Sequence, residues 1–262
     1  MIYDKLLVAL LSTLSSEPSG STNALIAQYL LDHAKGVENL SVKQLAAACH
    51  VGTGTISRFA REAGFLDFAD LRAALARTTR SYEAVDGTTF ESRVHALGNN
   101  VRAALVQSEE SVDRPMLARL VQDLRAYQKA SAFGLLKAQA AAIDLQVDLL
   151  MQGKYVETKT SLAEQRAHIA TARSDELIII FSYTGSYFDA CELGDALRRI
   201  DRPRIWMVSG THRSLPAYVY GQVTFSSDLG QLGHPYSLQL VSSLIAQEYA
   251  ALPRDETANP SA

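Results

Sequence analysis

The spacing of apolar residues changes partway along this 262-residue chain, and that change limits the possible folds more than any other feature. Up to about residue 82, apolar residues recur every three or four positions, which is the period of amphipathic helices. From about residue 113 onward, short β-rich runs alternate with segments of helical length, a pattern typical of a parallel sheet with crossover helices. We therefore expect an all-α domain (1–82), a linker helix (83–112) and an α/β domain (113–262).

The all-α domain is expected to contain five helices and no strand. Turn-forming residues at 15–20 separate the first helix from the second, which Ser21 or Thr22 can cap. The third helix, 42–49, follows Ser41, and Gln44 stands where a capping box requires Glu or Gln. The fourth helix, about 53–63, ends at Gly64, and a fifth helix follows it.

The α/β domain is expected to form a five-stranded parallel sheet. The run 178–181 is almost wholly apolar, as in a central strand that is covered on both faces. The predicted strands are 130–133, 155–157, 177–181, 205–208 and 223–225. The predicted helices between and after them are 139–151, 161–170, 188–200 and 234–252.

Residues 41–64 have the spacing of a helix-turn-helix, two short helices joined by a tight turn. Ala46 is small enough to let the two helices approach closely, and Leu45, Val51, Ile56 and Phe59 fall at the inward-facing positions. The second helix is therefore amphipathic. Its other side carries the polar residues Thr53, Thr55, Ser57, Arg58 and Arg61.

That polar side has the chemistry of a major-groove reader. An arginine fork can contact guanine O6 and N7, and Ser or Thr can contact phosphates or base edges. Free amides at the helix start can hold a phosphate, and Gly52 and Gly54 permit a close approach. The alternative is a bundle whose polar face is merely solvated, but the match over about 20 positions favours the DNA reader. The expected DNA contacts are Ser41, Lys43, Gly52, Thr53, Thr55, Ser57, Arg58 and Arg61.

Charge supports this interpretation only weakly. The net charge of −3 argues against a protein coated in nucleic acid. Residues 1–80, however, carry one more basic than acidic residue, and five arginines fall within 53–80. A small basic patch on an otherwise acidic chain is compatible with a compact DNA reader.

A second candidate site follows the strongest predicted strand. Ser182, Thr184, Gly185 and Ser186 lie at a strand-to-helix turn, at the end of a parallel strand where open α/β sheets place their ligands. Hydroxyl groups and backbone amides at such a turn suit a phosphate or a sugar hydroxyl. Because the same residue types are also common in ordinary turns, the motif alone leaves both interpretations open.

The helix-turn-helix resembles the DNA-binding domain of the RpiR/MurR family of bacterial transcriptional regulators. The matching residues are Leu40-Ser41, Leu45-Ala46, Val51-Gly52, Thr55-Ile56-Ser57-Arg58-Phe59, Arg61 and Gly64-Phe65. One position departs from the family pattern, because Gly52 stands where the family has Ser. The recognition helix therefore loses its usual N-cap unless Thr53 replaces it, which costs about 0.5–1 kcal/mol.

The turn at Ser182-Tyr183-Thr184-Gly185 resembles the phosphosugar loop of the sugar isomerase (SIS) domain, which follows the helix-turn-helix in RpiR-type regulators. The resemblance implies a three-layer αβα domain, a homodimer or tetramer, a double-stranded DNA operator, and a sugar phosphate or related effector. The implied effector-binding residues are Gly134, Ser182, Thr184, Gly185, Ser186 and Ser209.

The first loop of the α/β domain departs from that family. Where the family has Gly-x-Gly-x-Ser, this chain has Gly134-Leu135-Leu136-Lys137-Ala138, so a glycine and a hydroxyl are missing. Lys137 offers a charge, but on a flexible stem. The effector is therefore expected to be something other than a standard sugar phosphate or to bind weakly, or else the domain serves only as a dimerisation scaffold.

Other classes of function find less support in the sequence. An isomerase needs a positioned base, and His234, Glu192 and Glu248 form no recognisable constellation, so we expect no enzyme activity. Cys49 and His50 are too few to hold a metal, and we expect neither a metal nor a cofactor.

Cys49 and Cys191 are expected to be reduced thiols. Since no segment has the character of an export signal or a membrane span, we expect a cytoplasmic protein.

Overall fold

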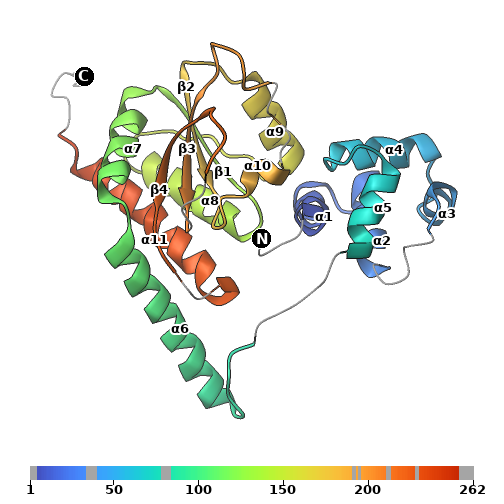
Figure 1. Ribbon diagram of the computed structural model, residues 1–262, viewed down its shortest axis with the longest axis horizontal. Coiled ribbons are helices and arrows are strands. Elements are labelled where there is room, and N and C mark those ends of the chain that lie inside the picture. The colour runs from blue at the N-terminus through green and yellow to red at the C-terminus, as the bar shows by residue number, and fades with distance from the viewer. Residues whose placement is uncertain are drawn as a thin grey trace, which may run out of the picture.

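The computed structural model describes residues 5–33, 40–77, 84–190, 193, 196–210, 214–227 and 230–253. It contains a bundle of helices, a parallel sheet between two layers of helices, and one long helix that leads from the first part to the second (Figure 1). The predicted fold class, a helical domain followed by a three-layer α/β domain, is confirmed apart from the number of strands.

The helical bundle has the five helices that the sequence predicts. Ser21 caps the second helix, since its Oγ accepts a hydrogen bond from the Ala24 amide at 3.2 Å. Ile26, Leu30, Ile56 and Leu71 are fully buried in the bundle core. The helices are α1 (Lys5–Ser16), α2 (Thr22–Asp32), α3 (Val42–Ala48), α4 (Thr53–Glu62) and α5 (Phe68–Arg77).

The long helix α6 (Phe90–Ser111) projects away from the rest of the molecule (Figure 1). Thr89 and Ser92 form a capping box at its start. Ala104 and Ser108, near its end, are buried, while Phe90 is 70% exposed. Only the last turns of α6 are therefore held by the α/β domain.

Within the described residues the sheet has four parallel strands, in the order β1-β2-β3-β4. The run 178–181 lies in β2, an inner strand, and is fully buried as predicted. The strands are β1 (Lys129–Gly134), β2 (Glu176–Phe181), β3 (Arg204–Ser209) and β4 (Val219–Thr224).

The predicted fifth strand, 155–157, is wrong. Only Glu157 pairs with the sheet, in a single parallel bridge to Ser131 on the outer side of β1. The pairing cannot extend because both flanks are held elsewhere: the Lys154 amide bonds the Leu149 carbonyl, and the Lys159 carbonyl accepts from Gln165. The bridge places residue 157 on one side of β1 and β2 on the other. After β1 the chain therefore crosses first to one side of this strand and then to the other, which makes the space between β1 and β2 a topological switch point. Open α/β sheets bind ligands at such points.

Helices cover both faces of the sheet, because its side chains alternate between two buried clusters. Ile179, Phe181 and Trp206 face one layer, and Ile178, Ile180 and Met207 face the other. The first layer consists of α7 (Arg114–Ala126), α8 (Lys137–Leu150) and α11 (Gly230–Ala251), and the second of α9 (Leu162–Thr171) and α10 (Tyr187–Ala190).

The predicted helix 188–200 is also wrong in its length. The helix α10 ends at Ala190, and the described residues after it, 193 and 196–200, are not helical. The Arg199 guanidinium donates to the carbonyls of Ala170 and Ala172, which ties this segment to the end of α9 instead of letting a helix continue. Cys191 and Glu192 lie outside the described residues.

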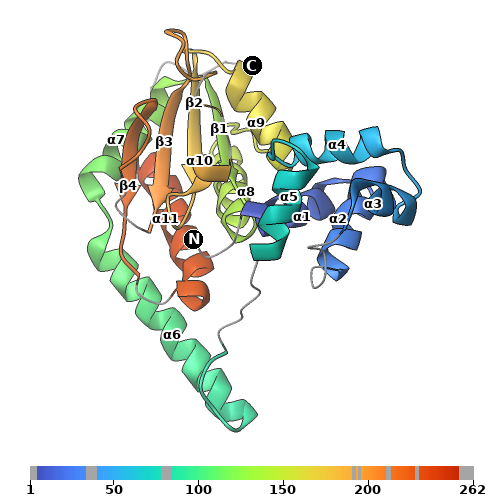
Figure 2. The same cartoon turned by 45° about the vertical axis from the view of Figure 1, so that its right-hand side comes forward.

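The helix α1 lies between the bundle and the α/β domain (Figure 2). It contacts α2 and α5 on the bundle side and α9 and α10 on the other. Its Ser12 is buried and accepts a hydrogen bond from the Leu162 amide, at the start of α9, with N···O 2.9 Å. One cluster of buried residues consequently runs from the bundle core to one face of the sheet. Among the described helices, none has both the length and the apolar character needed to cross a membrane.

Candidate DNA interface and ligand cleft

The turn between α3 and α4 is built by local bonds and one unusual backbone conformation. His50 has φ +54°, a left-handed conformation that His tolerates better than most residues. The Val51 amide then donates to the Ala46 carbonyl at 2.9 Å, which closes the turn. Ala46 is 4% exposed, so its small side chain lies at the close contact that the sequence predicted.

The helix α4 divides into an apolar and a polar side. Ile56, Phe59 and Ala60 are buried, which fixes the helix on the bundle. On the other side Thr53, Arg58 and Arg61 are exposed, and Thr55 and Ser57 are partly exposed. The division matches the one predicted from the sequence, and it leaves the polar side open to a partner.

The helix caps explain which of these polar groups are already engaged. The Ser41 hydroxyl accepts from the Gln44 amide at 3.2 Å in the predicted capping box, while Lys43 beside it is exposed. Gly52 is the N-cap of α4 and makes no side-chain bond, and Thr53 is the first helical residue rather than a replacement cap. A Cβ on Gly52 or Gly54 would meet nothing within 4 Å, so the fold itself does not require glycine there.

The two arginines of α4 are only loosely held. The Arg58 Nε lies 3.8 Å from Glu62 Oε1, and the Arg58 side chain is 65% exposed. The Arg61 Nε donates to the Ser57 carbonyl at 3.2 Å. Because exposed pairs of this kind contribute little, both guanidinium groups can exchange these contacts for an anion.

The candidate ligand site begins at the loop after β1, whose backbone is strained. Gly134 is required, since a Cβ there would lie 2.5 Å from the Ala138 carbonyl oxygen. Leu136 has φ +55° and ψ −120°, a conformation that suits glycine and that costs another residue about 1–3 kcal/mol. The loop therefore keeps the glycine-like backbone at the position where the SIS pattern has its second glycine.

The loop after β2 supplies the predicted hydroxyls. Ser182 is 9% exposed, Gly185 has φ +67°, and the Thr184 and Ser186 hydroxyls lie 2.5 Å apart. The helix that follows has four residues, too few for the helix dipole that the sequence interpretation invoked. Any anion in this loop must therefore be held by hydroxyls and loop amides.

The loop after β3 is tied to the second loop. Ser209 is fully buried and accepts from Gln222 Nε2 at 2.8 Å, so it lies beneath the cleft surface. The Gly210 amide donates to the Tyr183 carbonyl, and a Cβ on Gly210 would lie 2.9 Å from the Tyr183 ring.

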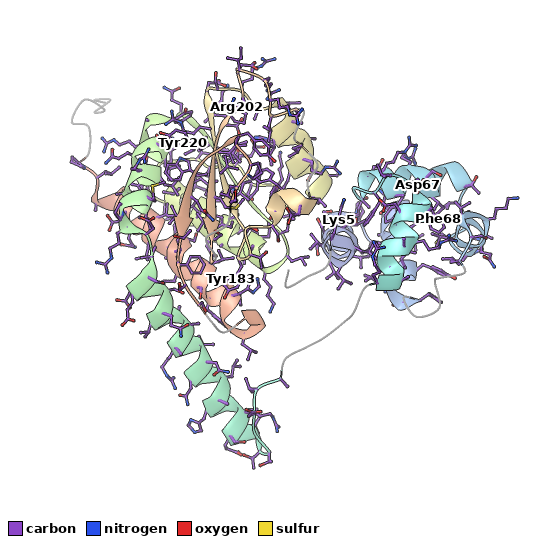
Figure 3. The ribbon with its side chains drawn as sticks, viewed as in Figure 1. Lys5, Asp67, Phe68, Tyr183, Arg202 and Tyr220 are labelled. Carbon is purple, nitrogen blue, oxygen red and sulfur yellow. The ribbon has the colours of Figure 1, made fainter. Side chains whose placement is uncertain are left out.

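Aromatic and hydroxyl side chains surround the second loop. Tyr183, labelled in Figure 3, lies on the side of the sheet covered by α11. The rings of Tyr183 and His234 lie edge to face at 5.1 Å, and the Tyr183 hydroxyl donates to the Ser227 carbonyl. Burial and the charge of Lys137 lower the pKa of His234 to about 4, so this imidazole is neutral near pH 7. The hydroxyls of Ser227 and Ser237 are buried without a hydrogen-bond partner among the described residues.

Gln165, on α9, joins the first two loops. This residue is fully buried, and its Nε2 lies 2.8 Å from both the Gly134 carbonyl and Gln139 Oε1. The Tyr187 hydroxyl donates to its Oε1 at 2.8 Å. Sequence pattern could not reveal this role, because a glutamine in a short helix is most often solvated.

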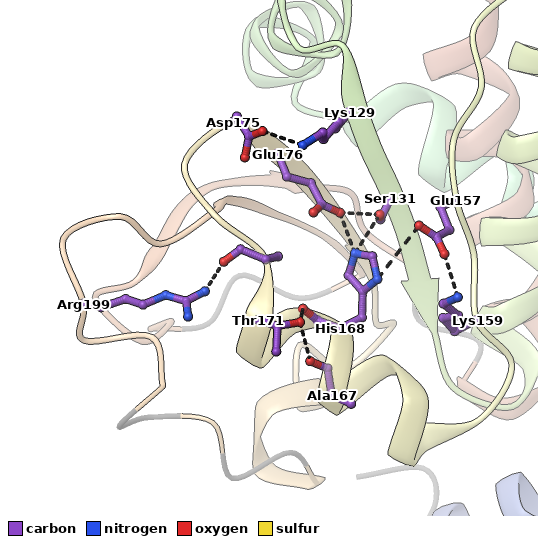
Figure 4. A network of polar contacts seen from close by, with 11 residues as sticks. Lys129, Ser131, Glu157, Lys159, Ala167, His168, Thr171, Asp175, Glu176 and Arg199 are labelled. Atoms are coloured by element: carbon purple, nitrogen blue, oxygen red, sulfur yellow. Dashed lines mark hydrogen bonds and ion pairs between the residues drawn. The ribbon is translucent and has the colours of Figure 1, made fainter.

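A polar network holds α9 at the other end of the sheet (Figure 4). His168 Nε2 lies 2.5 Å from Glu176 Oε1, and the Ser131 hydroxyl donates to the same oxygen at 2.6 Å. The hydrogen bond to Glu176 raises the pKa of His168 against the opposing effect of burial. The serine and Glu176 approach the same ring nitrogen, and Glu157 lies 3.9 Å from the other one, beyond hydrogen-bond distance, so the group lacks the order of a nucleophilic triad. Within the described part of the chain, no three His, Cys, Asp or Glu residues are placed to hold a metal ion.

Comparison with known proteins relates both parts of the chain to regulators. Residues 9–81 match the family model "Helix-turn-helix domain, rpiR family". The HTH-type transcriptional regulator HexR of Pseudomonas aeruginosa is 24% identical over 181 residues, which are 66% of this chain and 63% of HexR. The chain thus spans somewhat less than two thirds of that relative's length.

Two solved structures share the fold. The Vibrio vulnificus NanR protein, complexed with ManNAc-6P, aligns with a TM-score of 0.52 at 18% identity, over 93% of this chain and 90% of its own. The sugar isomerase domain of the RpiR transcription factor from Sphaerobacter thermophilus aligns with a TM-score of 0.50 at 20% identity, over 60% of this chain and 88% of its own. At these identities the likeness is one of fold.

Proposed function

We propose that this chain, whose residues 9–81 match the rpiR-family helix-turn-helix model, is a DNA-binding transcriptional regulator controlled by a metabolite bound at its SIS-type domain. The observation that carries the proposal is the division of α4 into a buried apolar side and an open polar side. Such a helix can lie in the major groove while its apolar side keeps it attached to the bundle.

We propose that the protein acts as a homodimer whose two α4 helices enter successive major grooves, about one helical turn apart. The start of α4 points away from the α/β domain and is free to reach base edges (Figure 1). The proposed contacts remain Ser41, Lys43, Gly52, Thr53, Thr55, Ser57, Arg58 and Arg61.

The proposed effector is a sugar phosphate or a related metabolite in the cleft formed by the loops after β1 and β2. NanR in complex with ManNAc-6P supports this class of ligand. The proposed contacts are Gly134, Ser182, Thr184, Gly185 and Ser186, with Ser209 supporting them from below. A route from this cleft to the bundle exists, because Gln165 touches the loop after β1 and Leu162, on the same helix, bonds to Ser12.

One observation favours a second candidate, a scaffold without a small ligand. Ala138 is buried where the SIS pattern has a serine, so the first loop offers no side-chain hydroxyl there. The same loss disfavours an isomerase, and we propose that the protein has no enzyme activity. Turnover of a ketose or aldose phosphate by the purified protein would contradict this proposal.

DNA binding is tested by enriching duplexes from a randomised pool with the full-length protein. Arg58→Ala should weaken binding to the enriched duplex by about 1–3 kcal/mol and relax the preference at one base position. Arg102→Ala, which removes an exposed arginine from α6, is the matched control and should leave binding unchanged. Failure of the wild type to enrich any duplex would overturn the DNA-binding proposal.

Effector binding is tested by calorimetric titration with ManNAc-6P and a panel of sugar phosphates. The double substitution Ser182→Ala and Thr184→Ala should abolish the heat that the wild type produces. Absence of heat from the wild type across the panel would favour the scaffold.

A further inference from the structure

A groove runs between the second half of α4 and the α/β domain. One wall carries Arg58 and Arg61 of α4, and the other is α9 with Arg166. The space between them is about 910 Å³ and is open to solvent. Two views show α4 and α9 next to each other, with the end of α4 directed at α9 (Figures 1 and 2).

The described lining of the groove carries more basic than acidic side chains. Three arginines line it, and among the described residues Glu62 is the one acidic member of the lining. Asn23 holds Glu62 from the far side at 3.2 Å. Arg166 is partly buried and has no hydrogen-bond or ion-pair partner among the described residues. Three guanidinium groups facing one space repel each other unless an anion lies between them.

The side of the groove formed by α9 carries small side chains as well as Arg166. Ala163, Ala167 and Ala170 line the groove, so an extended chain can lie close to this helix. Since the space is too small for a duplex, the anion that fits is a single polyanionic strand or a small anion.

The geometry of a major-groove complex supplies such a strand. A helix in the major groove lies between the two phosphate backbones that border the groove, which is about 12 Å wide. Since α9 faces the end of α4, a backbone that borders the major groove at that end can pass between the two helices. We infer that this groove receives one phosphate backbone of the operator, and that Arg166 of the α/β domain binds a phosphate beside Arg61.

This inference rests on the proposed DNA-binding function and adds the SIS-type domain to the DNA-binding surface. It also makes the contact responsive to the ligand cleft, because the neighbouring Gln165 bonds the loop after β1. A phosphate contact carries no sequence information, so Arg166 should contribute equally to binding of every sequence.

The test measures the affinity of full-length protein for an enriched duplex and for a scrambled one, between about 50 and 200 mM salt. Arg166→Gln should weaken both about three- to tenfold and make the slope of log K against log salt shallower by about one. Arg166→Lys should retain most of the slope, because it keeps the charge. Arg114→Ala, an exposed arginine on the opposite face of the sheet, should change neither value.

Two results would overturn the inference. An unchanged affinity and slope for Arg166→Gln would mean that no phosphate reaches the groove. Tighter binding by that variant would mean that α9 obstructs α4 instead of extending its surface. Both outcomes require a wild type that enriches a duplex, so they differ from failure of the DNA-binding proposal itself.

Discussion

The hydrogen bond between Ser12 and the Leu162 amide makes a sharp prediction about how the two parts of the chain are joined. Ser12 and Leu162 are each 4% exposed, and the N···O distance is 2.9 Å. In Ser12→Ala the amide stays buried without its partner, which costs about 1–3 kcal/mol. With a urea m-value of about 2–3 kcal/mol/M for a chain of this size, the unfolding midpoint should fall by roughly 0.3–1.5 M.

The matched control lies on the same helix. Ser15 is exposed, and its hydroxyl donates only to the Leu11 carbonyl one turn earlier. Ser15→Ala should change the free energy of unfolding by less than about 0.5 kcal/mol. Urea unfolding followed by circular dichroism measures both variants. Equal midpoints for Ser12→Ala and Ser15→Ala would refute the reasoning, because the Leu162 amide would then not depend on Ser12.

Three further predictions follow from local geometry. Leu136→Gly should be more stable than Leu136→Ala by about 1 kcal/mol in thermal unfolding, because glycine alone relieves φ +55°, and the reverse order would contradict the assigned strain. Gly54→Ala should stabilise the fold by about 0.5–1 kcal/mol, since Cβ enters open space, yet weaken DNA binding if the backbone approaches DNA there. The raised pKa of His168 means that its stabilising contribution is complete below about pH 6.5 and is lost as pH rises through the folded-state pKa, so His168→Gln should flatten that part of the stability profile.

Local sequence pattern was sufficient to predict the helix-turn-helix. The three- and four-residue spacing, the Ser41–Gln44 capping box and the small Ala46 are all encoded within a few positions of one another. The apolar run of β2 was equally clear, because burial on both faces leaves no room for polar residues.

Predictions failed where distant partners decide the structure. The segment 188–200 has helical spacing, but Arg199 is drawn to the carbonyl groups at the end of α9. Residues 155–157 have strand character, but their flanks are bonded elsewhere. Gln165 bonds the Gly134 carbonyl through a contact across the fold, and His234 packs on Tyr183 in the same way, which no spacing along the chain encodes.

The burial of α1 between the bundle and the sheet has a consequence for how this protein can respond to a signal. A DNA-binding domain on a flexible linker could be regulated only through the range of positions that the linker allows. Here the shared apolar cluster joins the bundle to one face of the sheet, so a shift of the helices on that face is passed on to the bundle. A small rotation of α1 would displace the start of α4, which is farther from the α/β domain, by a larger distance. In the proposed homodimer such a displacement would change the spacing between the two α4 helices.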